Sequence, residues 1–322
     1  MFIKKTIFSI AFIWILFISS IVYRERIYSG ISEFDAKYKI IEDIINIAYC
    51  TTSHHLSNTG YSIISILNRT KSKIHVYLYT PELFDKKNTI FDKLEIHKKG
   101  QIKFFMDTLN YTLCKINFHN QWNFWNPFAY ARIYMIEKIP VSKVIYLDTD
   151  VYGCDDINSL WKVKLGNNLI AGVLDKVPWK TAGAGPAHLK ILNSIMCRSE
   201  FKLMNNSGLT VDNYVNSGVL YMNIDELRKV NFTNRCVESY RRNQTFYPDQ
   251  DLINIFAGHR RIILDWKYNK NIYGNWAKCV LRHYNQKKVN HPVVVRHHED
   301  YDYYFDARDE YDRLMSMPNR TV

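Results

Sequence analysis

Two carboxylates one residue apart, Asp148 and Asp150, follow directly on the apolar run VIYL at 144–147. Such a pair is repulsive unless a cation lies between the two groups, and carboxylate oxygens suit Mg²⁺ or Mn²⁺. The same D-x-D spacing recurs at 249/251 and 300/302, but only the first pair follows an apolar strand-like run. We therefore predict a divalent-metal site at the first pair, against the alternative of capping or solvated loop acids. The 300/302 pair lies in a stretch typical of a solvated acidic face.

The segments around this pair alternate between strand-like and helix-like patterns. Helical apolar spacing occupies 59–70 and 127–138, and the second segment has proline in its first turn. Strand-like runs occupy 44–50, 73–80, 102–106, 143–148 and 168–174. Strands that alternate with helices predict an α/β fold with a mostly parallel sheet covered on both faces. In open sheets of this kind ligands bind beyond the carboxyl ends of the strands, which is where Asp148 and Asp150 fall.

The N-terminus has the character of a membrane span. Residues 6–23 carry no charge, and 18 residues form a helix of about 27 Å, close to the hydrocarbon thickness of a bilayer. This run is longer than the apolar region of most cleaved signal peptides, so we predict an uncleaved signal anchor, with a signal peptide as the alternative. The predicted organisation is a cytoplasmic tail at 1–5, a transmembrane anchor at 6–23, a stem at 24–44 and one domain at 45–322.

Charge, cysteines and sequons indicate which partners and which compartment to expect. The formal net charge of +12 favours anionic partners, but lysine and arginine are spread along the chain without a recognised motif, so we expect no nucleic-acid partner. The six cysteines show no C-x-x-C spacing, and their pairing as disulfides stays open. N-x-S/T sequons favour a lumenal chain; they lie at Asn68, Asn110, Asn205, Asn231, Asn243 and Asn319.

Five motifs, in order over roughly residues 46–297, resemble glycosyltransferase family 8, the retaining transferases of the GT-A fold that use nucleotide-sugar donors. They are YAR at 130–132, VIYLDTDV at 144–151, VNSGVLYMNIDELR at 215–228, YPDQDLIN at 247–254 and DWKYN at 265–269. Within the family, WKYNKNIYGNWAKC at 266–279 is most similar to the eukaryotic glucoside xylosyltransferase group. The resemblance implies a GT-A, Rossmann-like sheet and a catalytic role for the domain at 45–322.

The resemblance also implies a reaction. We expect a retaining α-glycosyltransferase that moves a sugar, xylose as the best guess, from a UDP-sugar to a glycan or glycoprotein acceptor. The expected cofactor is Mn²⁺, with Mg²⁺ as the alternative, and the expected location is the Golgi or endoplasmic reticulum membrane, type II, with the catalytic domain lumenal. Alternative hypotheses are a family 8 hexosyltransferase that uses UDP-glucose or UDP-galactose, a degenerate lumenal protein that binds a glycan or nucleotide without turnover, and a metal-dependent hydrolase.

Family motifs assign roles to further residues. Arg132 would form a forked contact with phosphate or sugar hydroxyls, and Asn216 and Ser217 would contact the donor. Asp249 and Gln250 would face the donor sugar and stabilise its cationic form as the catalytic pair. The structural alternatives are a surface salt bridge for Arg132, a strand-entry turn at the NSG motif, and capping of a helix by Asp249 or the other carboxylate of that pair.

A third metal ligand and a base pocket complete the expected site. The family supplies a histidine from a late H-x-x-G-x-x-K-P-W segment, and counting along PVVVRHHEDYDYYF at 292–305 places it at His297, with His298 as the main alternative. The family's glycine and lysine are absent after this histidine. Tyr49 and Thr51 are the donor-binding candidates after the first strand, where the family's acidic residue is missing.

Overall fold

The computed structural model describes residues 44–82, 84–87, 89–109, 127–175, 208–209, 212–242, 247–271, 279–284 and 298–318. The chain divides into two compact units, Met1–Asp43 and Ile44–Val322, and all described residues belong to the second. The predicted tail and anchor lie outside the described residues. None of the helices within the described ranges is long and apolar enough to cross a membrane.

The first half of this unit alternates strands and helices, as the sequence pattern predicts. Its elements are β1 (Ile45–Cys50), η1 (Ser53–His55), α2 (Leu56–Leu67), β2 (Ile74–Thr80), α3 (Ile90–His97) and β3 (Ile102–Thr108). The three strands pair in parallel, with Ile45 opposite Ile74 and Ile74 opposite Ile102. Parallel neighbours need a crossover between them, and α2 and α3 supply it.

The second half carries the acidic motifs. It begins with η2 (Pro127–Tyr130), α5 (Ala131–Lys138), β4 (Lys143–Leu147), β5 (Val151–Gly153), α6 (Asn158–Trp161) and β6 (Ile170–Leu174). It continues with β7 (Val215–Asn223), α9 (Ile224–Lys229), α10 (Phe232–Arg242), α11 (Pro248–Ala257) and β8 (Arg261–Leu264). The last elements are η3 (Trp266–Tyr268), β9 (Lys270–Asn271), β10 (Leu281–His283) and α13 (His298–Ser316).

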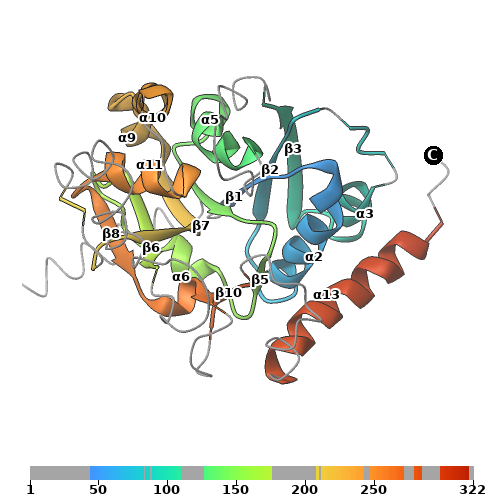
Figure 1. The fold of residues 1–322 in the computed structure, drawn as a ribbon. Helices are drawn as coiled ribbons and strands as arrows, with labels where there is room; N and C mark the ends of the chain where they lie inside the picture. Colours follow the sequence, from blue (N-terminus) through green and yellow to red (C-terminus); the bar gives the residue numbers. More distant parts are fainter. Residues whose placement is uncertain are drawn as a thin grey trace, which may run out of the picture. The chain divides into compact units, whose positions relative to one another are not determined.

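Within the described residues, seven strands form the central sheet in the order β3-β2-β1-β4-β7-β6-β8 (Figure 1). Among these described strands β7 alone runs against the others, because it pairs antiparallel with both β4 and β6. The expected mostly parallel α/β sheet is therefore confirmed. From β1 the chain moves outward through β2 and β3, and it returns to the other side of β1 with β4. This reversal lies between β1 and β4, at the position where open α/β sheets bind ligands.

Both faces of the sheet are buried, which explains the continuous apolar character of its strands. On one face, Ile47 of β1 and Ile145 of β4 belong to a core that includes side chains of α2, α3 and α13. On the other face, Ala48 and Tyr146 belong to a core with side chains of α5, α9, α10 and α11. Adjacent residues of a strand point to opposite faces. The carboxyl end of β4 therefore emerges between two packed layers, and its side chains are held in fixed directions.

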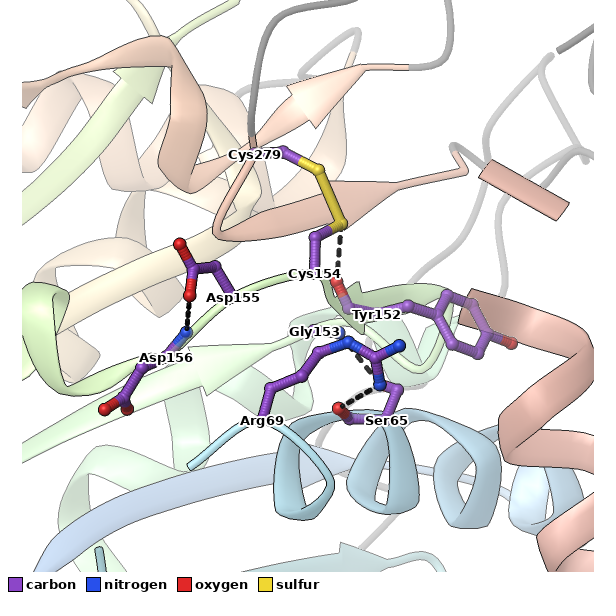
Figure 2. The surroundings of a disulfide bond; sticks show 8 residues. All are labelled: Ser65, Arg69, Tyr152, Gly153, Cys154, Asp155, Asp156 and Cys279. Atoms are coloured by element: carbon purple, nitrogen blue, oxygen red, sulfur yellow. Dashed lines mark hydrogen bonds between the residues drawn. A yellow bond between two sulfur atoms is a disulfide. The ribbon is translucent and has the colours of Figure 1, made fainter. Parts of the chain in front are cut away.

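A second sheet, in the order β5-β10-β9, lies beside the carboxyl end of β4. β5 and β10 pair antiparallel, with Gly153 opposite Leu281 and Val151 opposite His283. A Cβ at Gly153 would lie 2.9 Å from the backbone Cα of Ile66 in α2, so glycine is required for this close approach. The Gly153 amide donates to Ser65 Oγ over 2.8 Å and fastens β5 to α2 (Figure 2).

A disulfide joins Cys154, just after β5, to Cys279, just before β10 (Figure 2). The two Cα atoms are 5.7 Å apart. Cys236 is a buried free thiol, while Cys114 and Cys197 lie outside the described residues. The disulfide therefore clamps together the strand that follows Asp150 and the strand that ends at His283.

Candidate active site

The two acids of the first pair follow the last residue of β4 because the chain turns there from the central sheet into the second one. The Asp148 amide donates to Gly218 O over 2.8 Å, which extends the pairing of β4 with β7 by one residue. Three residues after Asp148, Val151 begins β5, and the Tyr284 amide donates to Asp150 O over 3.0 Å. Backbone hydrogen bonds thus fix both acids against β7 and β10, so their carboxylates lie at one defined place.

Asp148, Asp150 and His283 form a cluster whose potential ligand atoms all lie within 4.8 Å of one another. His283 Nε2 lies 3.4 Å from Asp150 Oδ1 and 3.9 Å from Asp148 Oδ2. Both carboxylates are partly exposed, whereas the imidazole is buried. Two carboxylates and one imidazole form a donor set suited to a divalent first-row metal such as Mn²⁺.

The surroundings of His283 favour a positive charge at this point. Burial lowers the pKa of the imidazole, but Asp150 and then Asp148 outweigh burial, and the net pKa is raised above 6.5. The other ring nitrogen, Nδ1, lies 3.1 Å from Asn269 Oδ1. The site is therefore one in which a proton or a metal ion would be stabilised between the two carboxylates and the ring.

Arg132, in the first turn of α5, connects the two acidic motifs. Its Nη2 lies 2.9 Å from Asp148 Oδ1, and its Nε lies 3.0 Å from Asp249 Oδ2. Burial lowers the pKa of the guanidinium, but the two carboxylates outweigh this and raise it. The guanidinium also lies over the ring of Tyr146, whose hydroxyl donates to Asp148 Oδ1 over 2.8 Å. With Oδ1 held by these two donors, Asp148 turns Oδ2 toward His283.

Asp249 and Gln250 lie in the first turn of α11 and are buried. Asp249 accepts from Ser217 Oγ over 3.2 Å, and burial raises its pKa despite Arg132. Gln250 accepts from the Ser217 amide over 2.8 Å and donates to Asp175 Oδ2 over 2.9 Å. Both predicted catalytic residues are thus anchored to β7 beside Arg132. Their contact with a donor sugar stays a prediction.

The NSG motif of β7 packs against the metal cluster. A Cβ at Gly218 would lie 2.1 Å from His283 Cε1, so only glycine leaves room for the imidazole. Asn216 Oδ1 accepts from the Gly218 amide over 2.9 Å and from Asn269 Nδ2 over 2.8 Å. Ser217 Oγ and O accept from Arg132 Nη1 over 3.2 and 2.9 Å. The motif therefore holds His283 and Arg132 in place through packing and hydrogen bonds. Donor contacts by Asn216 and Ser217 stay predictions.

Tyr49 and Thr51, the base-pocket candidates, are buried under α2. The Tyr49 hydroxyl lies 2.9 Å from Ser62 Oγ, and burial raises the pKa of the phenol. Thr51 Oγ1 accepts from Thr59 Oγ1 over 2.9 Å. In this geometry both hydroxyls contact α2, and a contact with a nucleotide base stays a prediction.

His283 is the histidine that sequence reasoning missed. His297 lies outside the described residues, and His298 begins α13 with a side chain whose placement is not described. A signal was present: HYNQKK at 283–288 has lysines four and five residues after the histidine. The family segment has its lysine six residues after, so the lysine that is missing after His297 has near counterparts after His283. These two lysines lie outside the described residues.

Asp251, the second carboxylate of the 249/251 pair, lies outside the metal cluster and binds groups around the start of α11. Asp251 Oδ1 accepts from the Tyr214 hydroxyl over 2.6 Å, and Oδ2 accepts from the Tyr247 amide over 2.9 Å. This second contact satisfies an amide at the start of α11, as a capping carboxylate does. The capping alternative therefore applies to Asp251, while Asp249 pairs with Arg132.

The chain has relatives among known protein sequences. Residues 46–298 match the sequence model of glycosyl transferase family 8. Lipopolysaccharide glucosyltransferase WaaO of Escherichia coli K12 is 25% identical over 260 residues, which cover 77% of this chain and 69% of that protein. A lipopolysaccharide 1,2-glucosyltransferase of the same strain is 24% identical over 256 residues, which cover 77% and 68%.

Solved structures share the fold. The galactosyltransferase LgtC, in complex with donor and acceptor sugar analogues, superposes with a TM-score of 0.60 at 17% identity over 86% of this chain and 98% of that one. Mouse xyloside xylosyltransferase 1 gives 0.52 at 12% identity over 75% and 98%. These likenesses confirm the expected GT-A arrangement. Since the family model extends over nearly all of the unit that holds the site, the chain belongs to glycosyl transferase family 8 and is a glycosyltransferase.

Proposed function

We propose that this chain is a metal-dependent, retaining α-glycosyltransferase that moves a sugar from a UDP-sugar to a glycan or glycoprotein acceptor. The observation that carries the proposal is the cluster of Asp148, Asp150 and His283 at the carboxyl end of β4. It lies at the switch point of the sheet, where a nucleotide ligand is expected.

The donor set fits a divalent cation, and Mn²⁺ is the proposed one. When bound, such an ion neutralises negative charge that develops on a diphosphate leaving group. Asp148 Oδ2, an oxygen of Asp150 and His283 Nε2 would hold it, because the remaining polar atoms of Asp148 and His283 are engaged by Arg132 and Asn269. Arg132 keeps Asp148 and Asp249 oriented. Because the acids of the site outnumber this one guanidinium, the remaining negative charge favours a dication.

The protein supplies positioning and electrostatics at the sugar. Asp249 and Gln250 are proposed to face the donor sugar and to stabilise its cationic form as the bond to UDP breaks. Their anchoring by Ser217 and Asp175 fixes them before the substrate arrives. The acceptor hydroxyl would attack on the face that the leaving group departs from, and the departing phosphate oxygen would take its proton.

For the donor sugar we propose a hexose. The two curated relatives from Escherichia coli are named glucosyltransferases, and LgtC is named a galactosyltransferase. The WKYNKNIYGNWAKC segment favours xylose, and mouse xyloside xylosyltransferase 1 is among the similar structures. At 12% identity that protein supports the fold alone. Xylose therefore remains the second candidate.

An oxidising compartment is proposed for the catalytic unit. The Cys154–Cys279 disulfide supports it, because such bonds persist mainly in lumenal and extracellular settings. The uncharged run at 6–23 supports anchoring as a type II protein of the Golgi or endoplasmic reticulum membrane.

The test is release of UDP by the full chain in detergent, with Mn²⁺, from UDP-glucose, UDP-galactose and UDP-xylose. We expect Mn²⁺-dependent release from one hexose donor and a loss of release on chelation. Release from UDP-xylose alone would replace the hexose by the second candidate. UDP binding without release from any donor, with or without glycan acceptors, would overturn the proposal in favour of a binding protein. Sugar transfer to water alone, with every acceptor, would indicate a hydrolase.

A further inference from the structure

A chain of side-chain amides connects the NSG motif to the histidine of the metal cluster. Asn216 lies in β7, and Asn269 follows η3 and precedes β9. Asn269 is buried, with 7% of its surface exposed, and it contacts both Asn216 and His283. The family resemblance assigns Asn216 to the donor, yet in this geometry its oxygen faces the protein.

The backbone amide of Gly218 fixes the direction of every hydrogen bond in this series of side-chain amides. The Gly218 amide can only donate, so the Asn216 atom 2.9 Å away must be its oxygen. Asn269 contacts the same oxygen over 2.8 Å and must present its NH₂ group there. Its own oxygen then faces His283 Nδ1 at 3.1 Å. A carbonyl oxygen only accepts, so Nδ1 carries a proton.

The fixed proton on Nδ1 determines what the rest of the ring offers. In a neutral imidazole one nitrogen donates and the other accepts, so Nε2 presents its lone pair. That lone pair faces Asp150 Oδ1 at 3.4 Å and Asp148 Oδ2 at 3.9 Å. In this neutral form three acceptors converge with no hydrogen between them, which is unfavourable unless a second proton on Nε2 or a metal cation lies among them. The amide chain thus prepares the ring as a ligand.

We propose that Asn269, held by Asn216, is a positioning residue that sets the tautomer and orientation of His283 toward the metal. The inference rests on the proposed function only in taking a metal as the occupant of the cluster. Gly218 holds the ring from its other side, because no larger residue fits against Cε1. Partners that orient ligating histidines typically contribute 10–100-fold to metal affinity. Asn269 would therefore act on the metal through His283, without touching the substrate.

Two variants of the full chain separate positioning from packing. N269L keeps a similar volume but removes both hydrogen bonds, and N269D keeps an acceptor for Nδ1. We expect the Kd for Mn²⁺, measured from the free Mn²⁺ signal by electron paramagnetic resonance, to rise about 10–100-fold in N269L. N269D should bind Mn²⁺ more tightly than N269L although it buries a new charge. A role in packing alone would give the reverse order.

The matched control is N46L. Asn46 is a half-buried amide of β1 that donates to Lys143 O at the opposite end of β4, over 3.4 Å. Its replacement should lower stability without changing the Kd for Mn²⁺. Equal Mn²⁺ affinity in N269L and in the unsubstituted protein would overturn the proposal. So would a comparable loss of affinity in N46L.

A second readout needs neither metal nor a variant of Asn269. Two-bond ¹⁵N–¹H correlation spectra of the metal-free protein at alkaline pH report which ring nitrogen carries the proton, and H283Q assigns the signal. We expect protonated Nδ1 and unprotonated Nε2. A proton on Nε2 instead would refute the proposed series of hydrogen bonds even if N269L does not fold. If the unsubstituted protein binds no Mn²⁺, the metal site itself fails, and this spectrum still decides whether Asn269 positions His283.

Discussion

The two D-x-D motifs at 148/150 and 249/251 are alike as sequences and differ as structures. Asp148 and Asp150 follow a strand, and both contribute to one cluster with His283. Asp249 and Asp251 lie in the first turn of α11, where residues two apart point about 200° from each other around the axis. Asp249 therefore pairs with Arg132, while Asp251 faces Tyr214 and the amide of Tyr247. The backbone beneath a pair of acids decides whether they can share a ligand.

The largest effect should come from the first pair. D150N removes one of the two carboxylates proposed to hold the metal, and metal ions contribute several kcal/mol to catalysis of this kind. At 1.36 kcal/mol per factor of ten, we expect UDP release to fall about a thousandfold. Turnover with Mn²⁺ that stays within a few-fold of the unsubstituted protein would show that the cluster is not the metal site.

Arg132 joins the two motifs and should have the next largest effect, on stability. R132M leaves the buried Asp249 and the partly exposed Asp148 without their partner, and breaking a buried ion pair such as Arg132–Asp249 costs about 3–5 kcal/mol. Denaturant unfolding measures the loss. Adding D249N should restore part of it by removing one of the two unpaired charges. No recovery in the double variant would indicate that Asp249 is already neutral when Arg132 is absent.

The disulfide distinguishes the two motifs covalently, because it clamps only the strands beside Asp150 and His283. The C154S/C279S variant should lose about 2–4 kcal/mol of unfolding free energy and bind Mn²⁺ more weakly. A C236S variant is the control, since Cys236 is a buried free thiol in α10. Weakened Mn²⁺ binding in C236S as well would mean that the loss reflects general destabilisation.

D251N should have the smallest effect and confine it to stability. The amide can replace only one of the two acceptor oxygens that Asp251 offers to Tyr214 and Tyr247, so a buried donor loses its partner at about 1–3 kcal/mol. We expect an earlier unfolding midpoint and an unchanged Kd for Mn²⁺. A clear rise in the Kd for Mn²⁺ would show that the second pair affects metal binding too, which would contradict the difference between the two motifs.

Periodicity predicted most of the architecture that positions the site. The strand-like runs at 73–80 and 143–148 correspond to β2 and β4, and the pattern at 127–138 corresponds to η2 and α5. Apolar runs predict strands reliably where both faces of a strand are buried, because burial on both faces requires continuous apolar character. The short strands β5, β9 and β10 were not predicted. With two or three residues each, they carry too little periodicity to detect.

By itself the sequence determined the family, and it predicted a metal-binding pair and the residues that a glycosyltransferase would place around its donor, because these are local motifs in a recognisable order. Only the tertiary structure decided that His283 is the histidine beside the pair and that Cys154 joins Cys279. It also decided that Arg132 lies between Asp148 and Asp249. Each of these contacts joins segments far apart in the chain, and their distance in space depends on strand order and register, which no local pattern encodes.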